Sequence, residues 1–237
     1  TTYGEALQNA LTPVLKTLHQ IPTQLQQMAL EREKTIRLNV LAASTLVTQA
    51  LISYKKDHDG LHFRLIQNSQ CEDADITVFT RENFQIPTDT KERYELFKER
   101  IFLAVPHNSP YASEESVRLQ DFAHEDFISL SGSRSIRTIC DRYCMQAGFV
   151  PHIIYESDSP DTVKNLIASG LGVGFWPHYT WGMDSMEQIR LLPIAEPTCQ
   201  RAIILQLHRH ARGQEAVCSF YAFLSRYLRQ LKAAEQH

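Results

Sequence analysis

The sequence predicts an α/β fold in which two αβ lobes are joined by two crossing strands. From residue 35 onward, short apolar runs alternate with amphipathic helical stretches, a pattern that indicates a mostly parallel sheet packed between helices. This alternation occurs on both sides of a buried run at residues 101–105. The chain has 237 residues, 43% of them hydrophobic, which is enough for one large domain or two intimate lobes.

Composition excludes several classes of protein. Charged residues make up 22%, and 9 Gly and 10 Pro are ordinary for a globular chain, so collagen-like and low-complexity structures are excluded. The net charge of −3 gives no general attraction to nucleic acid or to an anionic membrane. Five Cys spread over the chain do not resemble a disulfide framework and indicate a reducing compartment.

No segment approaches the roughly 20 apolar residues of a membrane span, and residues 1–20 lack the features of a secretion signal. We therefore expect a cytoplasmic protein without membrane partners. The first residue is Thr1 and not Met, as in a fragment of a longer protein.

Residues 1–33 show a repeat of apolar side chains at intervals of four and three, comprising Leu7, Leu11, Val14, Leu18, Ile21, Leu25 and Met28. This spacing is typical of a coiled-coil seam and predicts a partner helix. The alternative is an amphipathic helix that lies on its own domain. Pro13 and Pro22 predict either a kinked helix or two short helices.

The first lobe is predicted to begin with a strand at residues 35–41 and a helix that Ser44 or Thr45 caps. Two further strands are predicted at residues 61–67 and 74–80. The charged stretch 85–98 is predicted to be a loop, and the strand 101–105 ends at Pro106.

The second lobe is predicted to contain the following elements: a strand at 126–130, a turn at 131–133, a helix at 134–146, a strand at 152–156, a helix from 159 to 170 and a strand at 173–176. A strand at 202–207 and a C-terminal helix return to the first lobe. Two lobes crossed twice place a cleft at the strand ends, where free amides of helix N-termini suit small anions.

Several segments carry a family resemblance. They are Asn165-Leu166-Ile167-Ala168-Ser169-Gly170-Leu171-Gly172-Val173-Gly174-Phe175-Trp176-Pro177, Phe102-Leu103-Ala104-Val105-Pro106-His107-Asn108-Ser109-Pro110, Leu119-Gln120-Asp121-Phe122, Phe127-Ile128-Ser129-Leu130 and Ala147-Gly148-Phe149-Val150-Pro151. Over residues 34–232 the chain resembles the effector-binding domain of the LysR-type transcriptional regulators.

The resemblance implies a periplasmic-binding-protein-like fold of two Rossmann-like subdomains. Residues 1–33 would form the linker and dimerisation helix, residues 34–105 plus 205–237 subdomain I, and residues 106–204 subdomain II. The family carries a winged helix-turn-helix that contacts DNA before the linker, and this chain does not contain it. A homodimer or homotetramer is implied.

The implied function is the sensing of a small anionic metabolite between the lobes, with a coupling of roughly 1 to 3 kcal/mol to the DNA-binding heads. A solute-binding protein of a membrane transport system shares this architecture and is the alternative. It predicts an export signal and a monomer.

One departure concerns the stretch between Gln67 and Asp75. The family usually has a helix of apolar residues there, and this stretch is too short for one. We expect the first-lobe side of the cleft to be altered.

The predicted ligand-binding residues lie where strands end and helices begin. They are Ser44, Thr45, Thr80, Arg81, Ser131, Ser133, Arg134, Trp176 and Pro177. Hydroxyls and amides near Ser131 could hold a carboxylate or a phosphate, with Arg134 supplying charge. The alternative interpretations are that the serines only cap helices, that Arg81 is a solvated side chain and that Trp176 belongs to the core.

Other chemistry has little support in the sequence. Cys140 and Cys144 lie four apart on one predicted helix, and a packed face explains them better than a thiol sensor. The pair His208 and His210 lacks further ligands for zinc. There is no G-x-S-x-G, P-loop or H-E-x-x-H motif, so neither an enzyme nor a cofactor is expected. The basic C-terminal region, including Arg201, is interpreted as a solvated face.

Overall fold

The computed structural model describes residues 1–67, 69, 71–82, 86, 91–132, 135–182 and 187–234. Its helices are α1 (Thr2–Glu33), α2 (Ser44–Lys55), α3 (Ser135–Gln146), α4 (Pro160–Ala168), α5 (His178–Trp181) and α6 (Glu215–Ala234), with short 3-10 helices η1 (Leu119–Phe122) and η2 (Arg209–Ala211). Its strands are β1 (Thr35–Val40), β2 (His62–Gln67), β3 (Ile76–Arg81), β4 (Arg93–Pro106), β5 (Val117–Arg118), β6 (Asp126–Leu130), β7 (His152–Ser157), β8 (Gly174–Pro177), β9 (Ile189–Glu196) and β10 (Gln200–Leu207).

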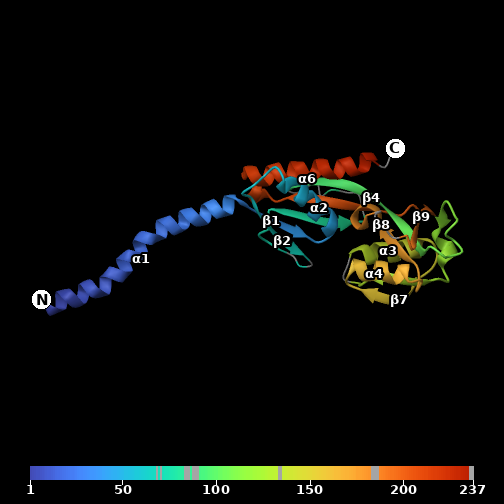
Figure 1. Cartoon of the computed structure of the whole chain (residues 1–237), viewed down its shortest axis with the longest axis horizontal. Coiled ribbons are helices and arrows are strands. Elements are labelled where there is room, and N and C mark those ends of the chain that lie inside the picture. Colours follow the sequence, from blue (N-terminus) through green and yellow to red (C-terminus); the bar gives the residue numbers. More distant parts are fainter. Residues whose placement is uncertain are drawn as a thin grey trace.

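Helix α1 forms an arm that projects away from the rest of the molecule and bends along its length (Figure 1). Pro13 and Pro22 both lie inside it, and a proline removes one amide donor from the helical ladder. The kinked helix is therefore found, in place of two short helices. Among the described side chains of its apolar seam, Leu7, Leu18 and Leu25 are more than half exposed, so the helix does not lie on its own domain.

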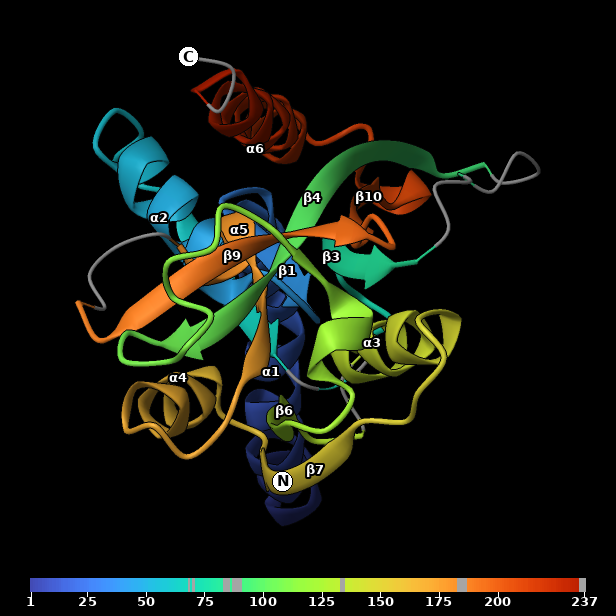
Figure 2. The ribbon, with the colours of Figure 1, turned by 90° about the vertical axis from the view of Figure 1, so that its right-hand side faces the viewer.

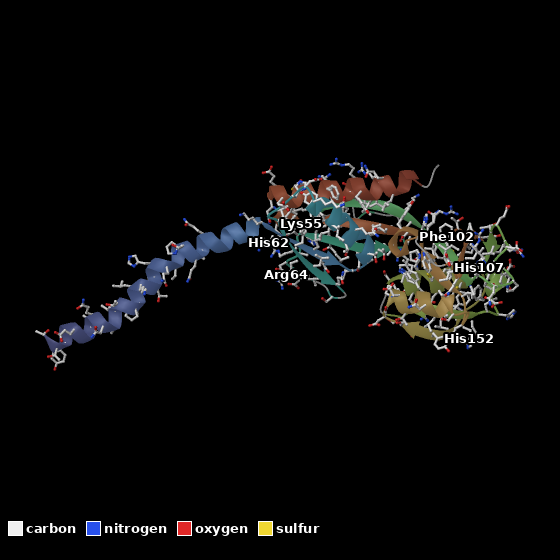
Figure 3. The ribbon with its side chains drawn as sticks, in the orientation of Figure 1. Lys55, His62, Arg64, Phe102, His107 and His152 are labelled. Atoms are coloured by element: carbon white, nitrogen blue, oxygen red, sulfur yellow. The ribbon has the colours of Figure 1, made fainter. Side chains whose placement is uncertain are left out.

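The first lobe is built around strands β1, β2 and β3, which are parallel and lie in the order β2-β1-β3. Alternate side chains of β1, including Ile36 and Leu38, are fully buried against α2 and α6. These helices lie together on one face of the sheet (Figure 2). At the outer edge, the exposed side chains of His62 and Arg64 stand on β2 (Figure 3).

Strands β4 and β10 join the two lobes. They pair antiparallel over their whole shared length, from Gln200 opposite Arg100 to Leu207 opposite Arg93. The prediction of a loop at residues 85–98 was therefore wrong for residues 93–98, which are the first part of β4. The charged residues of this strand did not give the apolar pattern of a buried strand, because they are paired with residues from distant segments of the chain. Glu95, for example, accepts hydrogen bonds from Ser225 and Arg229 of α6.

The second lobe has its own hydrophobic core, with Leu103, Phe122, Phe127, Ile167 and Leu192 completely or almost completely buried. Strands β8 and β9 pair antiparallel with β4, whereas β6 pairs parallel with β7. Helices α3 and α4 pack against β6. The sheets are thus mixed, and the expectation of a mostly parallel sheet was wrong, because the two crossing strands run against their neighbours.

Two glycines, Gly172 before β8 and Gly174 at its start, allow close packing in the second lobe. A Cβ atom on Gly172 would lie 2.5 Å from the carbonyl oxygen of Asp126, and one on Gly174 would lie 2.7 Å from Cδ1 of Ile167. Any larger residue would push β8 away from β6 and α4. Separately, no described helix is both long enough and apolar enough to cross a membrane.

Candidate functional site

A cleft of about 360 Å³ opens between the two lobes. The first lobe contributes the start of α2 and the end of β2, and the second lobe contributes the end of β6 and the starts of α3 and α4. Its polar lining residues are Ser44, Thr45, Gln67, Ser135, Asp158, Ser159, Asp161, Lys164, Thr180 and Arg201. A molecule bound here would touch both lobes at once.

The N-termini of α2, α3 and α4 all line this cleft. The first amides of a helix have no partner within the helix, and its dipole is positive at that end, so such a site attracts anions. In α4, the Ser159 side chain already accepts a hydrogen bond from the Thr162 amide at 3.4 Å. In α2, by contrast, no side chain caps the helix, so the backbone amides of its first turn are available to donate hydrogen bonds to a ligand.

The residue at the N-cap of α2 is Ala43, which has a φ of 60°. A left-handed conformation costs a non-glycine residue of order 1–3 kcal/mol, and such strain concentrates at functional sites. Ser44 and Thr45 follow Ala43 inside the helix, so the interpretation that they only cap α2 was wrong. Both line the cleft.

One lining residue of the cleft, Arg201, belongs to a buried ion pair. Nε of Arg201 lies 2.6 Å from Oε2 of Glu99, and both side chains are at most 3% exposed. Thr180 joins the two: its amide donates to Oε1 of Glu99 at 2.6 Å, its hydroxyl donates to Oε2 at 3.0 Å, and its Oγ1 accepts from Nη2 of Arg201 at 2.8 Å. These contacts fix the guanidinium where β4, β10 and α5 meet.

A second cation, Lys164 of α4, is held against two aromatic rings. Its ammonium lies 5.3 Å from the ring centroid of Trp176 and 5.7 Å from that of Trp181, and it donates to the Trp181 carbonyl at 3.1 Å. Cation–π contacts at partly buried sites hold such an ammonium in place. The acidic lining residues Asp158 and Asp161 are exposed, and Oδ1 of Asp161 lies 3.6 Å from Nζ of Lys164, so this carboxylate offsets part of the ammonium charge.

Direct contacts also connect the lobes beside the cleft. Oγ1 of Thr80 on β3 lies 2.6 Å from Oγ of Ser135 on α3. Arg142 of α3 forms an ion pair with Glu82, which follows β3. A change in the angle between the lobes must alter these contacts.

The structure places the other predicted site residues in different surroundings. Thr80 and Arg81 line a separate cavity of the first lobe. The Ser131 amide donates to the Ser157 carbonyl at 2.9 Å, and Ser131 is not among the lining residues of the cleft. Trp176 and Pro177 are buried, with Trp176 in the second core. Ser133 and Arg134 lie outside the described residues.

Sequence reasoning missed the two cations of the cleft. Arg201 was grouped with a solvated basic face, which was wrong for this residue, because it lies on β10 and is buried. The start of α4 was predicted at residue 159, and this position could have identified the cleft residues there. Nothing in the local sequence distinguishes Lys164 from an ordinary surface lysine of a helix.

The cysteines of α3 are packed. Cys140 and Cys144 are buried beside Cys199 in the second core. Burial raises the pKa of Cys144 and that of Cys199 to about 12 and raises the pKa of Cys140 as well. A thiol sensor needs the opposite, an exposed thiol with a low pKa.

The histidines are engaged by protein groups. Nε2 of His208 lies 2.8 Å from Oγ1 of Thr77, and Nε2 of His210 lies 3.4 Å from Oδ1 of Asp75. Within the described part of the chain, no group of three His, Cys, Asp or Glu side chains could hold a metal ion.

Comparison with known proteins agrees with this geometry. The protein-family model of the LysR substrate binding domain matches residues 30–229 of this chain. The chain is 25% identical, over 209 residues, to the uncharacterized HTH-type transcriptional regulator YybE of Bacillus subtilis. The match covers 85% of this chain and 70% of YybE.

Two solved structures share the fold. The effector binding domain of QuiR in complex with shikimate has a TM-score of 0.66 at 18% identity, covering 83% of this chain and 97% of that one. The regulatory domain of CcmR from Synechocystis PCC6803 in complex with 2-PG has a TM-score of 0.69 at 15% identity, covering 81% of this chain and 95% of that one. The family match extends over both lobes and all the residues of the cleft, and the chain belongs to the family of LysR substrate binding domains.

Proposed function

We propose that the cleft between the lobes binds a small anionic effector and that the chain is the sensing part of a transcription regulator. The observation that carries this proposal is the uncapped N-terminus of α2, which faces a cleft with Arg201 in its floor. Residues 34–105 plus 205–237 act as one subdomain and residues 106–204 as the other. The family match favours a regulator over a solute-binding protein of a transport system.

The effector acts by favouring one angle between the subdomains. A ligand that touches Ser44 of the first lobe and Lys164 of the second stabilises the arrangement in which both contacts exist. A differential affinity worth about 1 to 3 kcal/mol is enough to change the occupancy of a two-state regulator several-fold. The catalytic signatures absent from the sequence are not required for this activity.

The remaining parts of the proposal concern the whole regulator. DNA is contacted by a helix-turn-helix outside this chain, in line with the HTH-type name of YybE. The exposed seam of α1 pairs with the same seam of a second copy, giving a homodimer that can assemble further into a tetramer. A regulator of this kind works in the cytoplasm.

The effector site is tested by thermal unfolding with a panel of small carboxylates and phosphates. A ligand at about 100 times its Kd stabilises the native state by about 2.7 kcal/mol. Ser44→Trp fills the cleft at the start of α2 and should abolish that stabilisation. Ile52→Trp, on an exposed position of the same helix, is the matched control and should keep it. Stabilisation that persists in Ser44→Trp would place the ligand elsewhere.

A further inference from the structure

The charged side chains that line the cleft between the lobes are balanced in sign. Among the described lining residues, Lys164 and Arg201 are positive, and Asp158 and Asp161 are negative. The buried carboxylate of Glu99 adds a further negative charge 2.6 Å from Nε of Arg201. A lining with this balance leaves much of the charge of a doubly or triply negative ligand uncompensated. The cleft therefore suits a ligand with a single negative charge.

Arg201 keeps one nitrogen for a ligand. Its Nε donates to Glu99 and its Nη2 donates to Thr180, whereas no hydrogen bond joins its Nη1 to a described residue. Nη1 is not one of the buried side-chain atoms that lack a partner, so it retains accessible surface, and Arg201 lines the cleft. Because the Arg201 side chain is only 3% exposed, water screens a hydrogen bond to it less than at the surface.

The uncapped amides of α2 lie at the same end of the cleft as Arg201. Helix α2 is in contact with α5, and Thr180 of α5 accepts a hydrogen bond from Nη2 of Arg201 at 2.8 Å. A carboxylate has two oxygens and accepts several hydrogen bonds. One such group can therefore receive hydrogen bonds from the first amides of α2 and from Nη1 of Arg201.

The short connection between β2 and β3 limits what the first lobe contributes. Its described residues form no helix, as the length of this stretch predicts. Among the described residues, α2 is thus the helix of the first lobe whose N-terminus lines the cleft. A phosphate ester carries about −1.5 to −2 charges at pH 7, whereas a carboxylate carries one. A carboxylate fits this charge balance better than a phosphate.

The acidic residues at the start of α4 require hydrogen-bond donors on the rest of the ligand, because an ionised carboxylate only accepts. Asp161 lies in the first turn of α4, with its Oδ1 3.6 Å from Nζ of Lys164. A ligand ammonium bound to Asp161 would lie close to Lys164 and would be repelled by it. A hydroxyl group donates to Asp161 without this repulsion, and the hydroxyls of Ser44 and Thr45 can bind further hydroxyls.

The volume of the cleft limits the size of the ligand. At about 30 Å³ for each water molecule, 360 Å³ is the volume of about 12 waters. The ligand therefore has on the order of a dozen non-hydrogen atoms, which excludes nucleotides and larger cofactors. Leu130, Ile136 and Trp181 add apolar surface, which suits the carbon atoms of a short chain or a single ring.

We propose that the effector is a hydroxylated monocarboxylate of about four to seven carbon atoms. Its carboxylate accepts hydrogen bonds from the first amides of α2 and from Nη1 of Arg201, and its hydroxyl groups donate to Asp158 and Asp161. This inference rests on the proposed function and adds the chemical class of the ligand. Asp161 is then a residue that determines specificity, since it distinguishes a hydroxylated acid from the same acid without hydroxyls.

Calorimetry with matched sets of ligands tests the proposed class. The first set contains threonate, gluconate and ring carboxylates with several hydroxyls, and the second contains the same acids without hydroxyls. Two more sets replace the hydroxyls with a second carboxylate or with an ammonium group. At least one hydroxylated monocarboxylate should bind about tenfold or more tightly than each of its matched analogues.

A cycle of protein and ligand changes tests the contact with Asp161. Asp161→Ala should weaken binding of the hydroxylated acid by about tenfold or more and should change binding of the acid without hydroxyls much less. A merely structural role of Asp161 would weaken both ligands equally, and that result would overturn the assignment. Asp121→Ala, in the first turn of η1 and outside the cleft, is the matched control and should bind both ligands like the wild type.

The remaining outcomes separate this inference from the proposed function. If a dicarboxylate or an amino acid binds most tightly and Ser44→Trp abolishes its binding, the proposed class is wrong and the anion-binding cleft stands. If none of these ligands and no other small carboxylate or phosphate binds, both the class and the proposed function are overturned.

Discussion

The Glu99 carboxylate and the Arg201 guanidinium, 2.6 Å apart, form a buried ion pair where β4 and β10 cross between the lobes. Thr180 satisfies further atoms of both groups. The pair therefore fixes the crossing strands relative to α5 and at the same time presents Arg201 to the cleft. Its structural and its ligand-binding contributions can be separated by mutation.

Arg201→Met should lower the free energy of unfolding by about 3–5 kcal/mol, because the Glu99 charge is left buried with fewer partners. The double variant Glu99→Met with Arg201→Met should recover much of that loss, since no unpaired charge remains. Urea unfolding measures both effects. Arg118→Met, which breaks the exposed pair with Asp121, is the control and should cost less than about 1 kcal/mol. If the single Arg201→Met variant were as stable as the wild type, the ion pair would not contribute to the free energy of unfolding.

The contact between Thr80 and Ser135 should bias the angle between the lobes. Thr80→Val keeps the shape of the side chain and removes its hydrogen bond to Ser135, a net loss of about 0.5–1.5 kcal/mol. The ratio of closed to open molecules in the ligand-free protein should fall about two- to tenfold, which small-angle scattering would record as a larger radius of gyration. Thr48→Val, on the exposed side of α2, should leave the radius unchanged.

Sequence patterns predicted those helices and strands in which apolar residues recur regularly because one face of the element packs on one hydrophobic core. Ile36, Leu38 and Val40 alternate because one face of β1 packs on α2 and α6, and this was visible without coordinates. The first residues of β4 were not recognisable as a strand, because the partners of Glu95 and Glu99 lie on α6 and β10. Alternation of hydropathy fails wherever a buried charge replaces an apolar side chain.

The cleft was predictable in location and only partly in composition. Free amides at the start of α2 follow from element order, and Ser44 and Thr45 lie there. The order of helices and strands does not predict which side chains are buried within the cleft. Lys164 and Arg201 became recognisable as site residues only once Trp176, Trp181 and Glu99 were seen around them.

The buried thiols should make the protein less stable at alkaline pH. The pKa of Cys144 and that of Cys199 are about 12 in the folded protein, whereas a free thiol has a pKa of 9.0. Because the pKa of each thiol is higher in the folded protein, the thiol loses its proton at a lower pH in the unfolded state than in the folded state. The stabilisation is thus complete below pH 9 and is lost progressively as the pH rises toward 12.

Each of these thiols should contribute a slope of about 1.4 kcal/mol per pH unit in that window. Urea unfolding across this range would measure the slope, and Cys199→Ala should reduce it. Cys218→Ala, at a partly exposed cysteine outside the second core, is the matched control. Equal slopes in the wild type and in Cys199→Ala would show that the Cys199 thiol does not titrate differently on unfolding.

The seam of α1 should determine the oligomeric state. Leu18 is 54% exposed in a single chain, and the apolar residues before and after it repeat at coiled-coil spacing. Because α1 projects away from both lobes (Figure 1), a second copy of the same helix can cover the seam. Leu18→Asp introduces a charge whose burial without a partner costs several kcal/mol.

Sedimentation should therefore show a dimer or a larger assembly for the wild type and a shift to monomers for Leu18→Asp. Gln20→Asp adds the same charge to the same helix outside the seam and should sediment like the wild type. Ligand-induced thermal stabilisation should persist in both variants, since the cleft lies within one chain. A Leu18→Asp protein that remains dimeric would show that the lobes, and not α1, form the dimer interface.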